Sequence, residues 1–509
     1  MLASPPHASR FSQEIRDFYR GIRLGTGSSM SEKTYTTTVG LEIHAELKTV
    51  TKMFCHSKND PDETRPNANI CPICMGHPGT LPVINKKAVE QVLRVGLALK
   101  GTLADFTEFD RKNYFYPDIP KGYQLSQYKY PLVSGGELAG VKITRVHLEE
   151  DTATSIHDQG DHSLIDFNRA GVPLMELVTE PVIHSAKEAG DFARELQLLL
   201  QYLGASDANM EKGEMRVEAN ISVSDNPEKL GTKVEVKNIN SFRAVEKAIA
   251  YETARHIALL SKGERVVQET RGWDEHKEIT FSQRLKEDSH DYRYFPDPDL
   301  PKLKLSLVSE FSHDRLQKSL PELPSEKRAR YQTQFGLKPI DTEVFVVNKP
   351  LADFFESVSG LLSSPEAIKL ASNYLVSDFL GIAKKDTAHN AIGHALLRIT
   401  PTYFAELILL ISTGELSSRG AKDTLAEMYI SGGSPKSIAD SKGLIQKNDL
   451  EHLEKIAEEI VGEHTAAVAE YHAGKEASIQ FLVGQGMKKS SGSANPKLLR
   501  EAILRVIKK

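Results

Sequence analysis

Carboxylates and an imidazole recur together on segments that alternate apolar and polar residues. In LEIHAEL, residues 41–47, one face of an extended segment is apolar and the other carries Glu42, His44 and Glu46. Neighbouring carboxylates repel each other unless a positive charge lies between them. The segment is therefore either a solvated strand edge or one wall of a cation site, and by itself it favours the solvated edge.

Three further segments repeat this alternation: TRVHLEED, GEMRVEANISV and GTKVEVKNINSF. Glu150 needs a twist or bulge to join Glu149 on the charged face of the first of them. Four such strands, covered by helices on their apolar side, would form a concave polar sheet. Its candidate cation ligands are Glu42, His44, Glu149, Glu150, Glu218 and Glu235, and its candidate phosphate-binding cations are Lys112, Arg145 and Arg216.

These residue types suit phosphoryl transfer, which needs divalent cations on the phosphate oxygens and fixed positive side chains for the developing charge. Several carboxylates with one imidazole favour magnesium or manganese over zinc. The sequence has no Walker loop, GxGxxG fingerprint or nucleophile elbow, which argues against P-loop NTPases, dinucleotide enzymes and α/β hydrolases.

Cations and aromatic residues are interleaved in FDRKNYFYPDIPKGYQLSQY, residues 109–128, and again in SHDYRYFPDPDLP, residues 289–301. Such mixtures can stack on a base or bind phosphates. The alternative is that the tyrosines pack as a wall.

The three cysteines, Cys55, Cys71 and Cys74, lie close together in the sequence. An odd number of clustered thiols indicates a reducing compartment. They supply three of the four ligands that a structural Zn²⁺ needs, and His56 or His77 could supply the fourth. The alternative is three inert thiols.

The elements that must position these residues are those of an α+β chain. Helices are predicted from Asn85 to Gly101, from Ser185 to Gly204 with a capping box at Glu188, and after Ser241. The predicted division is an N-terminal extension at 1–33, expected to be disordered, a mixed domain at 34–298, a helical domain at 299–397 and a helical tail domain at 398–509.

The 509-residue chain has a formal net charge of -5, so any contact with RNA should be regional. The segment 488–509 concentrates seven cations against one acid, and Lys488, Lys489, Lys497 and Arg500 are its candidate phosphate-binding residues. The alternative is a frayed, solvated tail. No apolar run has the length of a membrane span, and Glu14 and Asp17 argue against an organelle transit peptide in residues 1–30.

Several long motifs resemble the aspartyl/glutamyl-tRNA amidotransferase B-subunit family over nearly the whole chain from about residue 35: VGLEIHAEL, CPICMGHPGTLPVIN, FDRKNYFYPDIPKGYQ, HLEEDT, LIDFNRAGVPLMELVTEP, GTKVEVKNINSF and DYRYFPDPDL. The resemblance implies a glutamine synthetase-like antiparallel-sheet cradle domain, followed by helical linker and tRNA-binding tail domains. It implies an enzyme that uses ATP and Mg²⁺ to convert Glu-tRNA(Gln), Asp-tRNA(Asn) or both. The cysteines and the N-terminal residues themselves favour the bacterial cytoplasm as its location. The implied partners are an amidase, which supplies ammonia, and a small third protein that completes a heterotrimer.

By motif match, the resemblance implies His44, Glu150 and Glu235 as magnesium ligands. Relatives that bind zinc usually have a second cysteine where this chain has Ser57, so the zinc site is either completed by another residue or eroded. Two rival interpretations stay open: a free-standing ligase that phosphorylates a small acid, and a non-catalytic scaffold that presents tRNA.

Overall fold

The four alternating segments are strands of one large sheet in a computed structural model of the chain. They form β1 (Thr36–Glu46), β8 (Val141–Glu150), β12 (Met215–Ser224) and β13 (Val234–Ile239). A strand that the sequence analysis did not predict, β11 (Pro173–Thr179), lies between β1 and β8. The structure describes residues 34–157, 160–285, 292–386, 391–446, 450–490 and 494–508.

The sheet runs in the order β15-β14-β13-β12-β1-β11-β8-β5-β4-β16, and of these neighbours in the described residues only β13 and β14 are parallel. The predicted extension at 1–33 lies outside the described residues. The remaining strands are β2 (Thr102–Leu103), β3 (Phe106–Thr107), β4 (Asp110–Asn113), β5 (Tyr123–Ser126), β6 (Val133–Ser134), β7 (Glu137–Leu138), β9 (Thr154–Ile156), β10 (Leu164–Asp166), β14 (Glu269–Asp274), β15 (Ile279–Leu285), β16 (Phe295–Pro296) and β17 (Leu303–Lys304).

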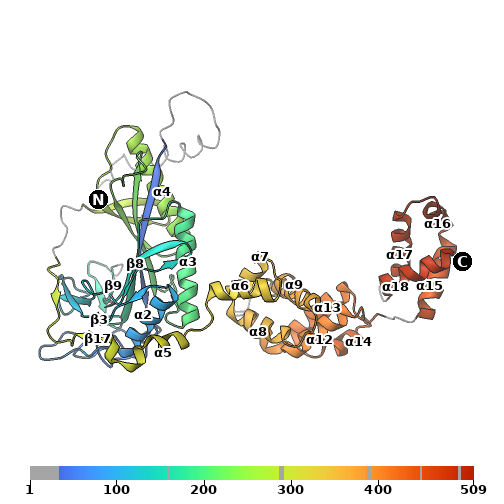
Figure 1. The fold of residues 1–509 in the computed structure, drawn as a ribbon, viewed down its shortest axis with the longest axis horizontal. Coiled ribbons are helices and arrows are strands. Elements are labelled where there is room, and N and C mark those ends of the chain that lie inside the picture. Colours follow the sequence, from blue (N-terminus) through green and yellow to red (C-terminus); the bar gives the residue numbers. More distant parts are fainter. Residues whose placement is uncertain are drawn as a thin grey trace. The chain divides into compact units, whose positions relative to one another are not determined.

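Three helices cover the apolar face of the sheet, which leaves the charged face for the site (Figure 1). They are α2 (Lys86–Ala98), α3 (Ala186–Leu203) and α4 (Phe242–Ser261), and all three were predicted. Each begins where a side-chain oxygen of Asn85, Ser185 or Ser241 accepts a backbone N–H of the first turn. The apolar side chains of β1 are fully buried beneath them, at about 1.5–3 kcal/mol for each Leu or Ile.

The first compact unit ends at Leu323, so the boundary lies later than the predicted residue 298. Leu300, Leu305 and Leu316 belong to the core beneath the sheet, and β17 pairs with β3. The segment 299–323 therefore packs on the first unit because it completes that unit's core. It contains η2 (Leu305–Leu307), η3 (Ser309–Phe311) and α5 (His313–Lys318).

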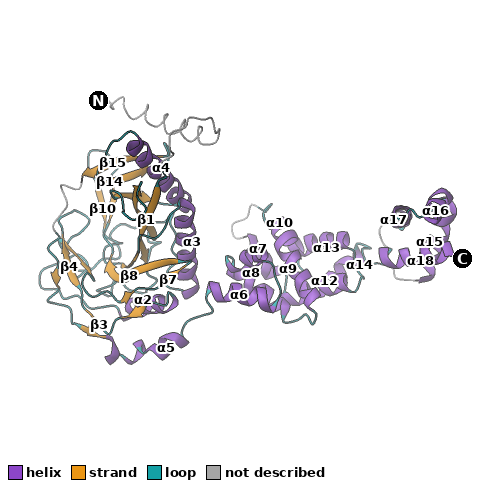
Figure 2. Cartoon of the chain, turned by 45° about the horizontal axis from the view of Figure 1, so that its top comes forward, coloured by secondary structure: helices purple, strands orange, loops and turns teal. Residues whose placement is uncertain are grey.

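The second unit, Pro324–Lys509, is built from helices in its described residues (Figure 2). One core extends from Tyr331 to Ala439 and another from Leu453 to Ile503. The cores therefore do not divide at the predicted residue 397, because α12 packs into the first of them. The helices are α6 (Pro324–Gln334), α7 (Pro339–Val346), α8 (Lys349–Ser359), α9 (Pro365–Asn373), η4 (Tyr374–Phe379), α10 (Leu380–Ala383), α11 (Ala391–Arg398), α12 (Pro401–Ser412), α13 (Ser418–Ser431), α14 (Pro435–Ser441), α15 (Leu450–Glu463), α16 (Thr465–His472), α17 (Ala477–Lys489) and α18 (Pro496–Lys508).

In the described part of the chain, no helix is long and apolar enough by itself to cross a membrane. Only the pair Ile392–Arg398 and Pro401–Ser412 meets that criterion together, and the two are bent by 79°.

Candidate active site

His44, Glu149 and Glu176 converge at the centre of the polar face of the sheet. β1 and β11 pair so that His44 lies directly opposite Glu176, and Glu149 projects from the neighbouring strand β8. The Nε2 atom of His44 is 3.3 Å from Oε2 of Glu176 and 3.5 Å from Oε1 of Glu149. One ligand atom from each residue lies within 4.8 Å of the other two, so the three could hold one metal ion.

The electrostatics of this trio are those of a site that attracts cations. Burial alone would lower the pKa of His44, but its hydrogen bond to Glu176 and the charge of Glu149 raise it to about 9. Burial alone would raise the pKa of Glu176, but the imidazoles of His147 and His44 lower it far below its usual value. Oε2 of Glu149 is buried without a hydrogen-bond partner. Nε2 of His147 is 3.9 Å from this oxygen, too far for a hydrogen bond. A buried carboxylate oxygen without a hydrogen bond is costly unless a cation binds it.

Two cationic side chains and a further imidazole lie close to the trio. Nη2 of Arg145 is 3.5 Å from Oε1 of Glu176, and Nε2 of His147 is 3.4 Å from Oε2 of the same carboxylate. Burial alone would lower the pKa of Lys112, but the charge of Glu149 raises it, so the ammonium stays protonated near the trio. The predicted cations Lys112 and Arg145 therefore lie where phosphate oxygens could reach them.

Glu42, Glu218 and Glu235 form a second acidic group on the same face. A cation from the protein already lies among them, since Nζ of Lys237 is 2.8 Å from Oε2 of Glu218 and 3.5 Å from Oε1 of Glu235. Burial and the charges of Glu176 and Glu218 raise the pKa of Glu42. This group extends the negative potential of the trio along the face.

Arg216, predicted as a phosphate-binding cation, is bound by a carboxylate instead. Its Nη2 atom is 2.6 Å from Oδ2 of the buried Asp151, and Arg169 lies 3.7 Å from the same oxygen. Burial alone would raise the pKa of Asp151, but these two guanidinium groups lower it to about 2. The charge of Arg216 is therefore compensated within the protein.

Glu150 does not join Glu149 on the polar face. The pairing of β8 with β11 is continuous at Glu149 and Glu150, so no bulge turns the two side chains to one side. Glu150 instead forms an ion pair with Lys121 and accepts the backbone N–H of Leu125 at 3.0 Å. The predicted magnesium set of His44, Glu150 and Glu235 is therefore not brought together in the structure.

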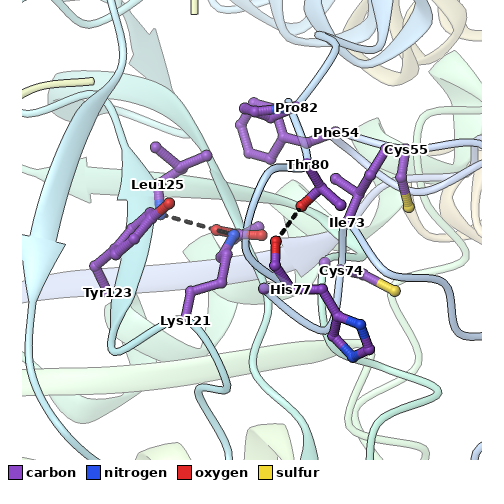
Figure 3. A pocket seen from close by; sticks show the side chains of 13 residues that line it. Phe54, Cys55, Ile73, Cys74, His77, Thr80, Pro82, Lys121, Tyr123 and Leu125 are labelled. Carbon is purple, nitrogen blue, oxygen red and sulfur yellow. Dashed lines mark hydrogen bonds and ion pairs between the residues drawn. The ribbon is translucent and has the colours of Figure 1, made fainter. Parts of the chain in front are cut away.

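Lys121 and Glu150 line a cavity of about 100 Å³ beside the cysteines (Figure 3). Its wall contains apolar groups as well, among them Phe54 and Leu125, and the thiols of Cys55 and Cys74. The cavity is thus a second polar region, and none of the three residues of the trio lines it.

The three cysteine thiols lie together: the Sγ atoms of Cys71 and Cys74 are 3.9 Å apart, and those of all three lie within 4.8 Å of one another. The ammonium of the buried Lys52 and the hydroxyl of Ser57 are each 3.9 Å from Sγ of Cys74. A hydrogen bond from Cys55, together with the charge of Lys52, lowers the pKa of Cys74 to about 5 although burial opposes this.

The predicted RNA-binding residues lie on the last two helices. Lys488, Lys497 and Arg500 are exposed. Lys489 is exposed as well, but its ammonium is 2.7 Å from a carboxylate oxygen of both Glu459 and Glu463. The cations of this surface therefore differ in how readily they could bind a phosphate.

Sequence reasoning did not name Glu176, Asp151 or Lys237 as site residues. Glu176 carried only a weak signal, because Met175 and Leu177 flank it but the apolar Leu174 and Val178 share its face. Asp151 follows the last residue of β8, where alternation no longer predicts direction.

The comparisons with known proteins agree with this architecture. The family model described as the GatB/GatE catalytic domain matches residues 37–309, and the one described as the GatB domain matches residues 353–507. The chain is 44% identical over 480 residues to the aspartyl/glutamyl-tRNA(Asn/Gln) amidotransferase B subunit of Caldanaerobacter subterraneus subsp. tengcongensis, covering 92% of this chain and 98% of that one. It is 41% identical over 490 residues to the protein of that name from Picosynechococcus sp., covering 92% and 97%.

These matches identify the chain as a component of an amidotransferase, an enzyme of the ligase type that forms carbon–nitrogen bonds. The chain belongs to the family of aspartyl/glutamyl-tRNA(Asn/Gln) amidotransferase B subunits.

Proposed function

We propose that this chain catalyses ATP-dependent transamidation of Glu-tRNA(Gln), Asp-tRNA(Asn) or both, on a glutamine synthetase-like cradle. The convergence of His44, Glu149 and Glu176 close to Lys112 and Arg145 carries this proposal. A carboxylate is a poor electrophile because its charge repels nucleophiles and oxide is a very poor leaving group. Phosphorylation supplies a leaving group, and phosphoryl transfer needs the charges that this face contains.

His44, Glu149 and Glu176 would hold a Mg²⁺ ion, and the buried oxygen of Glu149 that makes no hydrogen bond fits a metal ligand. A bound Mg²⁺ would neutralise the phosphate oxygens of ATP. Lys112 and Arg145 would bind the transferred phosphoryl group and orient it toward the acyl side chain.

The proposed reaction has two steps. The terminal phosphoryl group of ATP moves to a side-chain carboxylate oxygen of the aminoacyl group, and ADP leaves. Ammonia then forms a bond to the carboxyl carbon, and phosphate leaves with the oxygen. The names of the relatives, which describe one lettered component of an amidotransferase, support further components in the complex. We propose that these are an amidase, which is the ammonia source, and a small third protein.

Labelled ATP tests the function. With ammonium ions, γ-labelled ATP and a misacylated tRNA, the purified complex should release labelled phosphate in step with amide formation, and release should require the misacylated tRNA. A free-standing ligase would release phosphate from ATP without tRNA, and a scaffold would form no amide. Either result contradicts the proposal.

We also propose that the tail surface formed by Lys488, Lys497 and Arg500 binds tRNA phosphates. Replacing all three by alanine should reduce the slope of log affinity against log salt by about 2, since each phosphate contact contributes roughly 0.7–0.9. Lys489→Ala is the matched control, and it should change the slope less because Glu459 and Glu463 already bind that lysine. Filter binding over a salt series measures both. An unchanged slope in the triple variant would show that the tail does not contact phosphates.

We propose that Cys55, Cys71 and Cys74 hold a structural Zn²⁺ ion. Thiolates bound to zinc lie about 3.8 Å apart in a tetrahedron with bonds of about 2.3 Å, which the 3.9 Å between Cys71 and Cys74 matches. The two histidines predicted to supply the fourth ligand do not join the three thiols. His56 and His77 are both exposed, and neither belongs to the group of three. The hydroxyl of Ser57 lies close to the group, 3.9 Å from Sγ of Cys74.

Ser57→Cys should raise the affinity for zinc by at least about tenfold, because it completes a four-thiolate site. Ser57→Ala, the control, should leave the affinity near that of the natural chain. Competition with a chromogenic zinc chelator measures the affinities. If Ser57→Cys binds zinc no more tightly, the three thiols do not form a zinc site.

The state of the cysteines also indicates the cellular compartment of the chain. All three are free thiols in the structure, which supports our proposal of a reducing compartment, the bacterial cytoplasm. Recovery of the chain with oxidised cysteines from its native cells would contradict this.

A further inference from the structure

Four tyrosines gather at the edge of the sheet where β4 and β16 pair. The rings of Tyr128 and Tyr294 are stacked, with centroids 4.2 Å apart and planes at 11°. Tyr292 packs edge-on against Tyr294 with centroids 6.0 Å apart, and Tyr114 packs against Tyr292 at 6.1 Å. Tyr128 therefore lies at one end of the cluster, where its ring stacks on that of Tyr294.

Residues of β4 and a strained backbone fix these rings. Arg293, between Tyr292 and Tyr294, has a φ of +43°, a left-handed conformation that side-chain-bearing residues rarely adopt. The side-chain amide of Asn113 donates to the carbonyl oxygens of Tyr292 at 3.2 Å and Arg293 at 2.9 Å. Strain of this kind persists where the surroundings enforce it, and it is concentrated at functional sites.

The backbone that carries the Tyr128 ring is held from the same strand. The carboxylate of Asp110, a buried residue of β4, accepts the backbone N–H of Tyr128 at 3.1 Å and that of Lys129 at 3.4 Å. Both partners of the stacked pair are thus held before any ligand binds, which lowers the entropy cost of binding.

The register of the strands places this cluster on the same face as the trio of His44, Glu149 and Glu176. Asp110 pairs with Ser126, and Ser126 pairs with Glu149, so the three share a face. Lys112, two residues from Asp110, lies on that face with its ammonium 5.0 Å from the ring centroid of Tyr292. A ligand that reaches Lys112 from the trio would therefore extend toward the tyrosines.

Tyr128 is 63% exposed although Tyr294 covers one face of its ring, so its outer face is open. A rigid, open aromatic face beside a polar site is the feature that stacks a nucleobase. We infer that the outer face of Tyr128 stacks on the adenine of an adenosine whose reacting group lies at His44, Glu149 and Glu176. This inference rests on the proposed function, in which two substrates carry an adenosine: ATP, and the 3′-terminal nucleotide that bears the acyl group.

The test compares Tyr128→Ala and Tyr128→Leu, which remove the ring, with Tyr128→Phe, which keeps it. In the complete complex, removal of the ring should raise KM by about tenfold for one of the two adenosine-bearing substrates, with a much smaller change in kcat, and Tyr128→Phe should behave as the natural chain. A raised KM for ATP identifies the nucleotide as the ligand, and a raised KM for misacylated tRNA identifies the terminal adenosine. Equilibrium dialysis with labelled ATP, without tRNA, checks the first assignment by binding alone.

The inference is overturned if neither KM changes on removal of the ring, or if Tyr128→Phe is as impaired as Tyr128→Ala. These failures differ from failure of the proposed function, in which phosphate release would not depend on misacylated tRNA in the natural chain. Tyr128→Leu guards against misfolding, because it keeps a larger apolar side chain than alanine at this position.

Discussion

Glu176→Gln should reduce the rate of amide formation at least about a hundredfold, because it removes a charged oxygen from the proposed Mg²⁺ site. The change preserves size and leaves His44 and Glu149 in place, so the loss should come from the site and not from the fold. Glu176 interacts with His44, His147 and Arg145, which places its carboxylate at the centre of the charged groups. Ammonium ions supplied directly make the assay independent of the ammonia source.

Glu264→Gln is the matched control, since Glu264 is an exposed carboxylate just beyond the end of α4 and belongs to neither acidic group of the polar face. It should leave the rate unchanged. Electron paramagnetic resonance of added Mn²⁺ supplies a second measurement, in which Glu176→Gln should bind the ion at least about tenfold more weakly than the natural chain. Full activity and undiminished Mn²⁺ binding in Glu176→Gln would contradict the assignment of this residue.

The helices were predictable because their signals are local. Asn85, Ser185 and Ser241 each begin a helix as the sequence indicates, and Gly204 ends α3 in a left-handed conformation. The strands were predictable for the same reason where apolar and charged residues alternate strictly. Glu42 and His44 were named as candidate ligands because this alternation recurs in several strands, and the family resemblance then favoured a cation site.

The partner of His44 was not predictable from local pattern. Glu176 lies in PLMELVT, in which apolar residues share its face as well as the opposite one, so the alternation is incomplete. Only the pairing of β11 with β1 brings Glu176 opposite His44, and the order of strands in a sheet is set by long-range contacts. Glu150 is the opposite case. The family motif predicted it as a magnesium ligand, but the alternation of side chains along β8 turns it toward Lys121.

The boundary between the two compact units, after Leu323, is likewise determined by long-range packing. The sequence after residue 298 reads as helical, and α5 is indeed a helix, but Leu316 on α5 is buried in the core beneath the sheet. Composition alone does not show which core a short helix completes.

A second large effect is expected on stability, from a buried charge network beneath β14 and β15. Glu252 of α4 is fully buried and receives the guanidinium of Arg255 at 2.7 Å, Arg271 at 3.2 Å and the imidazole of His256 at 3.2 Å. Glu269 binds Arg271 at 2.6 Å. Glu252 thus compensates, together with Glu269, the charges of Arg255 and Arg271, two largely buried arginines.

Glu252→Gln should lower the free energy of unfolding at neutral pH by about 3 kcal/mol, since removing one partner of a buried ion pair leaves the others uncompensated. Trp273, the single tryptophan of the chain, lies on β14 and is 6% exposed, so its fluorescence during a urea titration reports this region. Glu246→Gln, on the same helix, is the matched control. It removes a partly exposed ion pair with Arg194 and should cost no more than about 1 kcal/mol.

The pH dependence distinguishes the lost charge from a loss of packing. Burial alone would raise the pKa of Glu252, but the hydrogen bond with His256 and the charges of Arg255 and Arg271 lower it from 4.5 to about 2. A carboxyl group whose pKa is depressed in the folded state stabilises the protein at any pH above its pKa in the unfolded state. This contribution disappears as the pH falls toward its pKa in the folded state. The difference in stability between the natural chain and Glu252→Gln should therefore be constant above about pH 5, shrink below pH 4.5 and vanish near pH 2. A difference that persists unchanged to pH 3 would show that Gln disturbs packing and that the charge of Glu252 contributes little.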